Sequence, residues 1–364
     1  MGYDKCYIVD FEECKDANEY LVKYGKASLQ LRLNNAWQYP IEGVFSLENF
    51  ESDLDLLFEV GLQKASTLDI EELDKLISWD TGRLYTITGI PSHGKSEFVD
   101  FICELLNIKY KWKVGYFSPE NHPLQLHTSK IIEKISGKEF NKKYINIDEY
   151  KELKNYVNEN YFFINPKENF TVDNILDSAR QLVERKGIKV LILDPYNKFD
   201  HNVGTLSETS YISSFLDKLT VFAQKNNVLV FLVAHPTKMR KENGIFEVPN
   251  LYSINGSANF YNKTDFGITI YRDFNTNIIE VHIQKVKFKH LGEVGMATFK
   301  YNINNGRFVF YDVDSMSDII NWDNRNHLKE EKLINKKENI QLENKFTNFY
   351  EPNENKENES YLPF

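Results

Sequence analysis

The chain has 364 residues, and its 44 Lys and Arg against 53 Asp and Glu give a formal net charge of −9. Its hydrophobic residues, 41% of the total, are enough for a substantial core, which excludes a wholly disordered chain. The longest apolar run, Val228 to Ala234, is too short to span a bilayer, and no secretory segment follows Met1. Three scattered cysteines predict neither a disulfide framework nor a zinc site, so we expect a reducing, cytoplasmic location and no membrane contact.

The character of the sequence changes twice along the chain. Residues 1–80 mix polar and aromatic side chains and predict short helices around Asp16–Lys23 and Leu68–Trp79. Residues 81–315 alternate apolar runs with amphipathic stretches. Residues 316–364 contain no glycine and are crowded with Asn, Lys and Glu, which predicts a frayed helix followed by a disordered acidic tail.

The middle region predicts an α/β fold. Four short, mostly apolar runs are expected to be strands: Arg83–Thr88, Lys113–Phe117, Val190–Leu193 and Val228–Val233. Amphipathic helices separate them, which indicates a mostly parallel sheet with helices on both faces. From Gly267 onward, closely spaced strands with Asn and Gly turns between them are expected to be antiparallel and to extend one edge of the sheet: Gly267–Arg272, Ile278–Lys287, Ala297–Ile303 and Phe308–Val313.

The segment after the first of these strands matches a phosphate-binding loop in full. It reads Gly89-Ile90-Pro91-Ser92-His93-Gly94-Lys95-Ser96, the pattern G-x-x-x-x-G-K-[ST]. Its glycines let backbone N–H groups wrap a phosphate, and the following helix adds its positive N-terminal end. Lys95 is expected to neutralise the β- and γ-phosphates and the Ser96 hydroxyl to bind Mg²⁺, so the loop predicts binding of ATP with Mg²⁺. The alternative is an ordinary glycine turn.

Three further side chains follow predicted strands. Asp194 ends the strand Val190–Leu193, at the sheet edge where the loop also lies, and is expected to help hold the metal; otherwise it only starts a turn. Glu120, shortly after the second strand, is either a general base that activates water or a solvated turn residue. His235 follows the run that ends at Ala234 and is either a γ-phosphate sensor or a structural histidine.

These motifs occur in one order along the chain. After the loop come Phe117–Asn121, Leu191–Pro195, Ala234–Lys238, Gly256–Asp265 and Gln284–Gly295. Together they resemble the RecA-like motor domain of DnaB-type hexameric replicative helicases, most closely the Twinkle and phage primase-helicase branch. The resemblance implies a RecA-like P-loop NTPase core at residues 81–315. It also implies a homo-oligomeric ring, expected to be a hexamer, that acts on single-stranded DNA.

The same resemblance implies roles for individual residues. Glu120 becomes the catalytic base and His235 the γ-phosphate sensor. Each ATP in such a ring lies between subunits, where a cation from the neighbouring subunit completes the catalytic site. The family usually has arginine where this chain has Lys287, and lysine supplies the charge without the planar fork. Either Lys285 or Arg272 shares the role, or activation by the neighbour is weaker.

The first 80 residues extend the resemblance. Residues 1–44 are similar to the end of a Toprim module through Val9-Asp10, Cys14–Leu21 and Tyr39–Gly43. The metal-binding carboxylates of a working Toprim core would lie before residue 1, so we interpret this region as a remnant and predict no primer synthesis. Residues 45–80 are expected to be the linker whose helix packs against the neighbouring subunit.

Two segments between sheet strands are candidates for holding single-stranded DNA, His201–Ser210 and Lys238–Tyr261. The second segment contains the candidate phosphate-binding residues Lys238, Arg240, Lys241, Gly256, Ser257 and Asn259. Basic side chains pair with backbone phosphates, and N–H groups that open a helix cradle one, so little sequence preference is expected. The alternative is a solvated loop with a basic cluster.

The acidic tail ends in Tyr361-Leu362-Pro363-Phe364 and resembles the C-terminal tip of bacterial single-strand-binding proteins. Such a tip docks into an apolar pocket of a replication partner; a solubilising tail is the alternative. As a whole, the sequence predicts an ATP-dependent replicative DNA helicase with a primase or another replication protein as partner. The alternatives are a RecA/RadA-like recombinase and a non-processive ATP-binding assembly factor.

Overall fold

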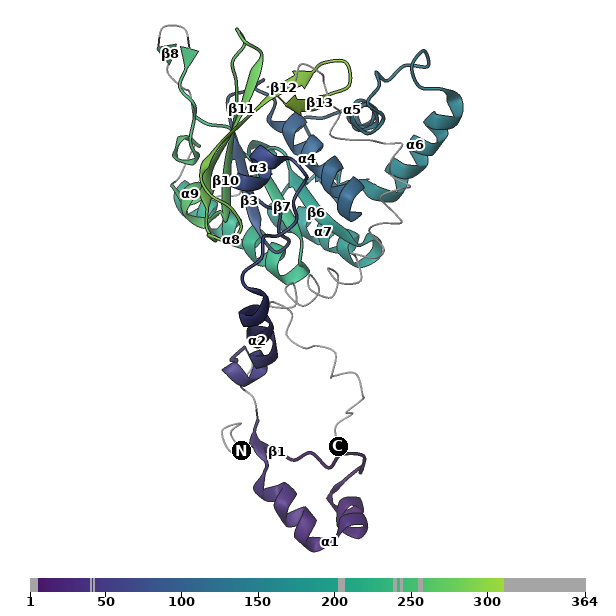
Figure 1. Cartoon of the computed structure of the whole chain (residues 1–364), viewed down its shortest axis with the longest axis vertical. Helices are drawn as coiled ribbons and strands as arrows, with labels where there is room; N and C mark the ends of the chain where they lie inside the picture. Colours follow the sequence, from purple (N-terminus) through teal and green to yellow (C-terminus); the bar gives the residue numbers. More distant parts are fainter. Residues whose placement is uncertain are drawn as a thin grey trace. The chain divides into compact units, whose positions relative to one another are not determined.

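The computed structural model describes residues 6–39, 41, 43–201, 207–237, 241–242, 245–254 and 258–310 (Figure 1). Contacts divide the chain into two compact units, Met1–Gly61 and Leu62–Phe364. The predicted tail at residues 316–364, with its Leu-Pro-Phe tip, lies outside the described residues, and so does the end of the predicted strand Phe308–Val313.

The first unit has little core. Its elements are β1 (Tyr7–Ile8), α1 (Ala17–Asn34), β2 (Trp37–Gln38), the 3₁₀ turn η2 (Leu47–Asn49) and α2 (Glu51–Val60). The Asp16 side chain caps α1, and the predicted helix at Asp16–Lys23 is confirmed. The helix continues to Asn34 across a break at Gly25, where φ is +82°. The Toprim interpretation of this region stays a prediction.

The second unit is built on a nine-stranded sheet with the order β13-β12-β11-β10-β3-β7-β6-β4-β5. Its strands are β3 (Leu84–Thr88), β4 (Lys113–Phe117), β5 (Tyr161–Phe163), β6 (Ile188–Leu193), β7 (Leu229–Val233), β10 (Phe266–Arg272), β11 (Ile278–Val286), β12 (Gly295–Asn302) and β13 (Arg307–Phe310). The six strands from β10 to β5 are parallel to one another, and the pairs from β10 to β13 are antiparallel. The predicted α/β fold is confirmed.

The strand β10 corrects one expectation. It was expected to be antiparallel like the strands after it, but it lies parallel to β3 and pairs antiparallel only with β11. The burial pattern gives the reason, because the first five residues of β10 are all buried, as in a central parallel strand covered on both faces. In β11 buried and half-buried residues alternate, as in a strand with one solvated face. The antiparallel extension therefore begins at β11.

Helices cover both faces of the sheet (Figure 1). One face packs against α3 (Glu71–Leu76), α4 (Lys95–Tyr110), α5 (Leu124–Ser136) and α6 (Ile147–Asn160). The other packs against α7 (Val172–Lys186), α8 (Glu208–Asn226) and α9 (Asn259–Lys263). Short elements complete the described chain: the 3₁₀ turns η3 (Tyr196–Lys198) and η4 (Leu251–Ser253), and the hairpin of β8 (Lys241–Glu242) and β9 (Ile245–Phe246).

Residues 62–80 belong to the second unit. The predicted helix at Leu68–Trp79 is present but shorter, as α3, and the chain after it runs alongside Gly292 and Ser66. Trp79 is fully buried, and its ring lies 5.5 Å from that of Tyr85 and 5.7 Å from that of Phe231. This stretch therefore closes one face of the motor sheet. Whether α2 packs against a neighbouring subunit stays a prediction.

Among the described residues, no helix combines the length and the apolar character needed to cross a membrane.

The burial of Trp79 predicts a large loss of stability on truncation. We expect Trp79→Ala to lower the free energy of unfolding by about 3–5 kcal/mol, because a fully buried indole is replaced by a cavity. Urea denaturation of the whole chain measures this. Ile303→Ala is the control, since Ile303 is 83% exposed and its removal leaves no cavity. Equal losses in the two variants would contradict the placement of Trp79 in the core.

Candidate nucleotide-binding site

The predicted phosphate-binding loop lies at the carboxyl end of β3 and leads directly into α4. Gly89 has a φ of +148°, and a Cβ at this position would lie 2.3 Å from the carbonyl oxygen of Ile270. Gly94 has a φ of +94° immediately before the first turn of the helix. Side chains at these two positions would clash with β10 or strain the turn, so the glycines are what allows the loop to close over a phosphate.

Lys95 is buried inside this loop, with 5% of the residue exposed. Its Nζ donates hydrogen bonds to the carbonyl oxygens of Gly89 at 2.8 Å and Ile90 at 3.1 Å. Burial lowers the pKa of Lys95 to about 8, and the carboxylates of Asp194 and Glu120 oppose that change. The neighbouring carboxylates thus compensate only in part for the cost of burying this positive charge. A bound polyanion such as a triphosphate would supply the remaining negative charge.

Asp194 lies at the carboxyl end of β6, next to the loop, as the sequence predicted. Its carboxylate accepts a hydrogen bond from the Ser96 side chain, and burial raises its pKa to about 6. A hydroxyl and a carboxylate are hard oxygen donors, and Mg²⁺ takes one or two carboxylates plus phosphates and water. No group of three or more acidic, His or Cys side chains among the described residues provides an alternative metal site. The pair therefore fits Mg²⁺ shared with a nucleotide.

Glu120 and His235 also meet at this edge of the sheet. The His235 Nε2 lies 4.0 Å from a Glu120 carboxylate oxygen, although 115 residues separate them in sequence (235 − 120). Burial lowers the pKa of His235, and the charge of Lys95 adds to this effect, which favours the neutral imidazole. Glu120 is 45% exposed, so its carboxylate is accessible to water at the mouth of the site.

Lys198 is a member of this group that the sequence analysis missed. It lies on η3, four residues after Asp194, and its Nζ is 3.5 Å from the other oxygen of Glu120. Glu120 is thus placed between a lysine and a histidine. In the sequence, the one signal for a role of Lys198 is its closeness to the Asp194-Pro195 turn. Its contact with Glu120 arises because the fold brings η3 next to the segment that follows β4.

His93 turns its side chain away from the loop. Its Nδ1 accepts a hydrogen bond from the Arg272 N–H at 2.9 Å, and its ring packs against those of Tyr271 and Phe274. Burial lowers the pKa of His93 to about 4, so the ring is neutral at physiological pH. His93 therefore braces the loop against β10. Pro91 and Ser92, the other predicted loop residues, are exposed at its tip.

Lys287 lies at the other end of β3 from the loop. It follows β11, and its Nζ pairs at 2.9 Å with the carboxylate of Asp265, which also accepts the N–H of Leu84. The loop begins after Thr88, roughly 13 Å away along the strand. Lys287 therefore lies away from the phosphate loop of its own subunit, and its predicted role toward a neighbouring subunit stays a prediction.

The two alternative cations are placed differently. The backbone N–H of Arg272 donates to His93, which places Arg272 beside the loop of its own subunit. The Lys285 Nζ hydrogen-bonds the backbone carbonyls of Tyr261 and Asn262 in α9. Of the three candidates, Lys287 alone combines a half-exposed ammonium group with a carboxylate partner at this edge.

Most of the predicted DNA-binding residues fall outside the described part of the chain: Lys238, Arg240, Gly256 and Ser257. Lys241 is described only as a backbone position in β8, paired with Phe246. Asn259 opens α9, and its side-chain amide donates to the Thr209 carbonyl oxygen at 3.2 Å. Thr209 and Asn259 line an open surface groove and come from the two segments predicted to hold DNA. The fold thus brings the borders of these segments together.

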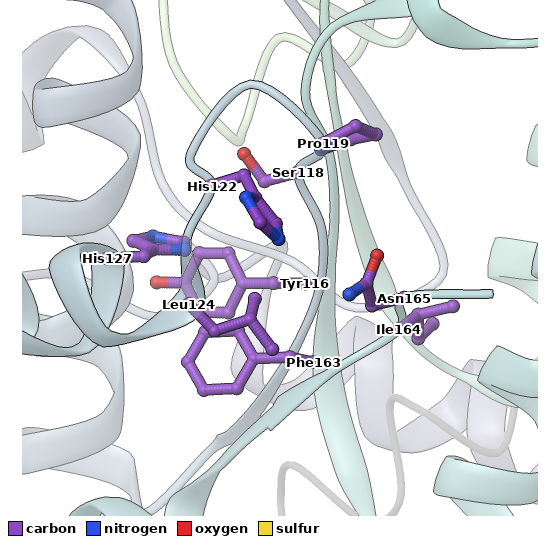
Figure 2. Close-up of a pocket in the computed structure, with 9 residues that line it drawn as sticks. All are labelled: Tyr116, Ser118, Pro119, His122, Leu124, His127, Phe163, Ile164 and Asn165. Carbon is purple, nitrogen blue, oxygen red and sulfur yellow. The ribbon is translucent and has the colours of Figure 1, made fainter. Parts of the chain in front are cut away.

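A small cavity lies behind the segment that carries Glu120 (Figure 2). Figure 2 shows the rings of Tyr116, His122 and His127 around it. Neither ring nitrogen of His127 has a hydrogen-bond partner among the described residues, although an Asp100 oxygen lies 3.5 Å from its Nε2. The cavity holds about one water molecule at most and is too small for a nucleotide.

The fold and the site together define the chain as a RecA-like P-loop NTPase. The DnaB-like helicase C terminal domain family matches residues 66–309, and the chain belongs to that family. It is 32% identical over 331 residues to the "Twinkle homolog protein, chloroplastic/mitochondrial" of Arabidopsis thaliana, a match that covers 85% of this chain. The chain spans about half the length of that relative, 46%.

Two solved structures have a similar fold. The ATPase domain of G40P superposes with a TM-score of 0.62 and 18% identity, covering 74% of this chain and 100% of that one. A DnaB-like replicative helicase, described with its interactions with primase, gives a TM-score of 0.59 and 18% identity over 81% of this chain and 74% of the other. At this identity the similarity concerns the fold, which confirms the RecA-like architecture.

The lowered pKa of Lys95 predicts a pH dependence of nucleotide binding. Above a pKa of about 8 the free protein loses the Lys95 charge, whereas a bound triphosphate favours the charged form. We therefore expect the affinity for ATP to fall roughly tenfold from about pH 7 to about pH 9, with proton uptake on binding near the upper limit. Calorimetry in two buffers of different ionisation enthalpy measures both quantities.

Lys95→Met is the control for this pH dependence. It should bind ATP weakly and with no proton uptake between the same two pH values. Proton uptake by the variant equal to that of the unsubstituted chain would assign the effect to another group.

Proposed function

We propose that the chain is an ATP-dependent replicative DNA helicase that forms a ring, translocates on single-stranded DNA and unwinds duplex DNA. One observation carries the proposal: the Lys95 loop, Asp194, Glu120 and His235 meet at one edge of the sheet, while Lys287 lies at the opposite end of β3. Such a subunit has a nucleotide site on one side and a cation for a second site on the other, which suits a head-to-tail ring.

The residues of the site support defined roles in ATP hydrolysis. Lys95 and the loop amides bind the phosphates, and Ser96 with Asp194 holds Mg²⁺. Bound Mg²⁺ supplies positive charge that stabilises the phosphoryl-transfer transition state. Glu120 accepts a proton from the attacking water, and His235, next to it, registers the γ-phosphate. The Nζ of Lys198 lies 3.5 Å from a Glu120 carboxylate oxygen and holds this side chain at the mouth of the site.

The step from hydrolysis to movement rests on the chain that follows His235. Three residues after His235 the candidate DNA-holding segment begins at residue 238, and the chain returns through Ile254, which pairs with Pro236. A γ-phosphate sensor at the base of a DNA-holding segment would couple loss of phosphate to displacement of the strand. We expect six subunits in the ring, Lys287 as the trans-acting cation, contacts to the DNA backbone, and a primase or another replication protein as partner.

The role of Glu120 predicts a separation of binding from hydrolysis. Glu120→Gln should lower the rate of single-stranded-DNA-stimulated ATP hydrolysis by about 10²–10⁴-fold and leave ATP binding nearly unchanged, because the amide cannot accept the proton. Lys95→Ala should lose both. Phosphate release with and without single-stranded DNA, with nucleotide binding by calorimetry, measures the difference. Glu149→Gln, which removes the Lys138 ion pair far from the site, is the matched control.

Unimpaired hydrolysis in both Glu120→Gln and Lys95→Ala would refute the proposed site. Hydrolysis with strand exchange but no unwinding would instead favour the recombinase, and binding without DNA-stimulated turnover would favour the assembly factor.

The proposed packing of α2 predicts a role in assembly. Its Phe58 side chain is 90% exposed and Leu54 is 42% exposed, so the described first unit does not bury this apolar side. Phe58→Asp should shift the protein from rings to smaller species in native mass spectrometry and leave the thermal unfolding of the subunit unchanged. Glu59→Gln, one residue further along α2, should still form rings. Rings of unchanged size in Phe58→Asp would contradict the packing proposal.

A further inference from the structure

Asp265 links Lys287 to the first residue of β3. One of its carboxylate oxygens accepts the N–H of Leu84, the first residue of β3, at 3.1 Å, and the other accepts the Lys287 Nζ at 2.9 Å. The backbone repeats both links, since the Asp265 N–H donates to the Leu84 carbonyl oxygen and the Lys287 N–H donates to that of Asp265, both at 3.0 Å. Asp265 is thus fixed to the strand that carries the phosphate loop.

The two partners of this ion pair differ in exposure. The Asp265 side chain is 1% exposed and the Lys287 side chain is 51% exposed. A half-exposed lysine has a long flexible stem, and ordering it costs side-chain entropy. The buried carboxylate of Asp265, directly before β10, restrains that ammonium group through one ion pair, and an ammonium group has three N–H donors in all. The ion pair therefore holds the ammonium group in place at the surface and uses only one of its three N–H donors.

We infer that Asp265 is a positioning residue, which orients Lys287 toward the triphosphate held by a neighbouring subunit. The inference rests on the proposed trans role of Lys287 and adds the group that makes a lysine effective there. Arginine orients itself through its planar fork, whereas lysine behaves as a point charge and depends on a second group for its direction. Asp265 supplies that direction in this chain.

A substitution can separate this role from a structural one. In Asp265→Asn the amide oxygen can still accept the Leu84 N–H, so the start of β3 keeps its hydrogen bond. The amide nitrogen is a donor and cannot pair with the ammonium group of Lys287. The variant thus removes the restraint on the cation and retains the shape of the site. Asp265→Ser, with a smaller hydroxyl acceptor, is the second variant if the asparagine protein fails to fold.

The test uses rings assembled from two complementary subunits. One subunit carries Lys95→Ala and donates only Lys287; the other carries Lys287→Ala and donates only the phosphate loop. ATP is hydrolysed only where the two meet in the productive order. Asp265→Asn added to the Lys287-donating subunit should lower single-stranded-DNA-stimulated hydrolysis about tenfold, as expected for a misplaced catalytic group. Added to the loop-donating subunit, it should change the rate less than twofold.

Each outcome has a distinct meaning. Equal losses in the two placements, or no loss in either, would overturn the positioning role. Absence of hydrolysis in the starting mixture would refute the trans action of Lys287 itself, and with it both proposals. Asp173→Asn in the Lys287-donating subunit is the matched control, because it removes an exposed Asp–Lys pair between α7 and α8 and should leave the mixture unchanged.

Discussion

The nucleotide-binding site depends on one buried charge, the ammonium group of Lys95, a residue that is only 5% exposed. The nearby carboxylates of Asp194 and Glu120 compensate for its burial only in part. Burial lowers its pKa to about 8, while burial of Asp194 beside it raises the pKa of that carboxyl to about 6. Both groups are therefore in environments that disfavour their charged forms until a phosphate and a metal ion arrive. The free energy of nucleotide binding therefore includes the gain from compensating the buried charges of Lys95 and Asp194. Because β3, β6 and α4 bury these two residues, nucleotide affinity depends on the packing of these elements.

The central strand β3 links the parts of this site. It ends in the phosphate loop, and its first residue is hydrogen-bonded to the carboxylate that holds Lys287. All five of its residues are buried, between β10 on one side and β7 on the other. A buried strand deforms little, so β3 holds the phosphate loop at one end and Lys287 at the other at a defined distance from each other.

The sequence predicted much of the fold because apolar strands and amphipathic helices have different periods. Lys113–Phe117 is a strand with the expected bounds, and amphipathic helices such as α7 separate the parallel strands as expected. The prediction was wrong or missing where a strand's direction or existence depends on its neighbours in the sheet and not on its own sequence. The direction of β10 depends on its neighbours in the sheet, and β5, for which the sequence analysis made no prediction, has only three residues. The position of Lys198 beside Glu120 depends on a contact between two loops that local sequence does not encode.

By itself, the sequence determined the phosphate loop and the order of the motifs. Both are local, because a tight turn that leads into a helix needs glycines, a lysine and a hydroxyl at fixed spacing. Only the tertiary structure showed the partners of Arg272, Lys285 and Lys287, of which the family resemblance had favoured Lys287. Their partners separate them: His93 holds the backbone of the first near its own loop, carbonyl groups of α9 engage the second, and Asp265 presents the third. Those partners are brought together by strand pairing across the sheet, which is a long-range property of the chain.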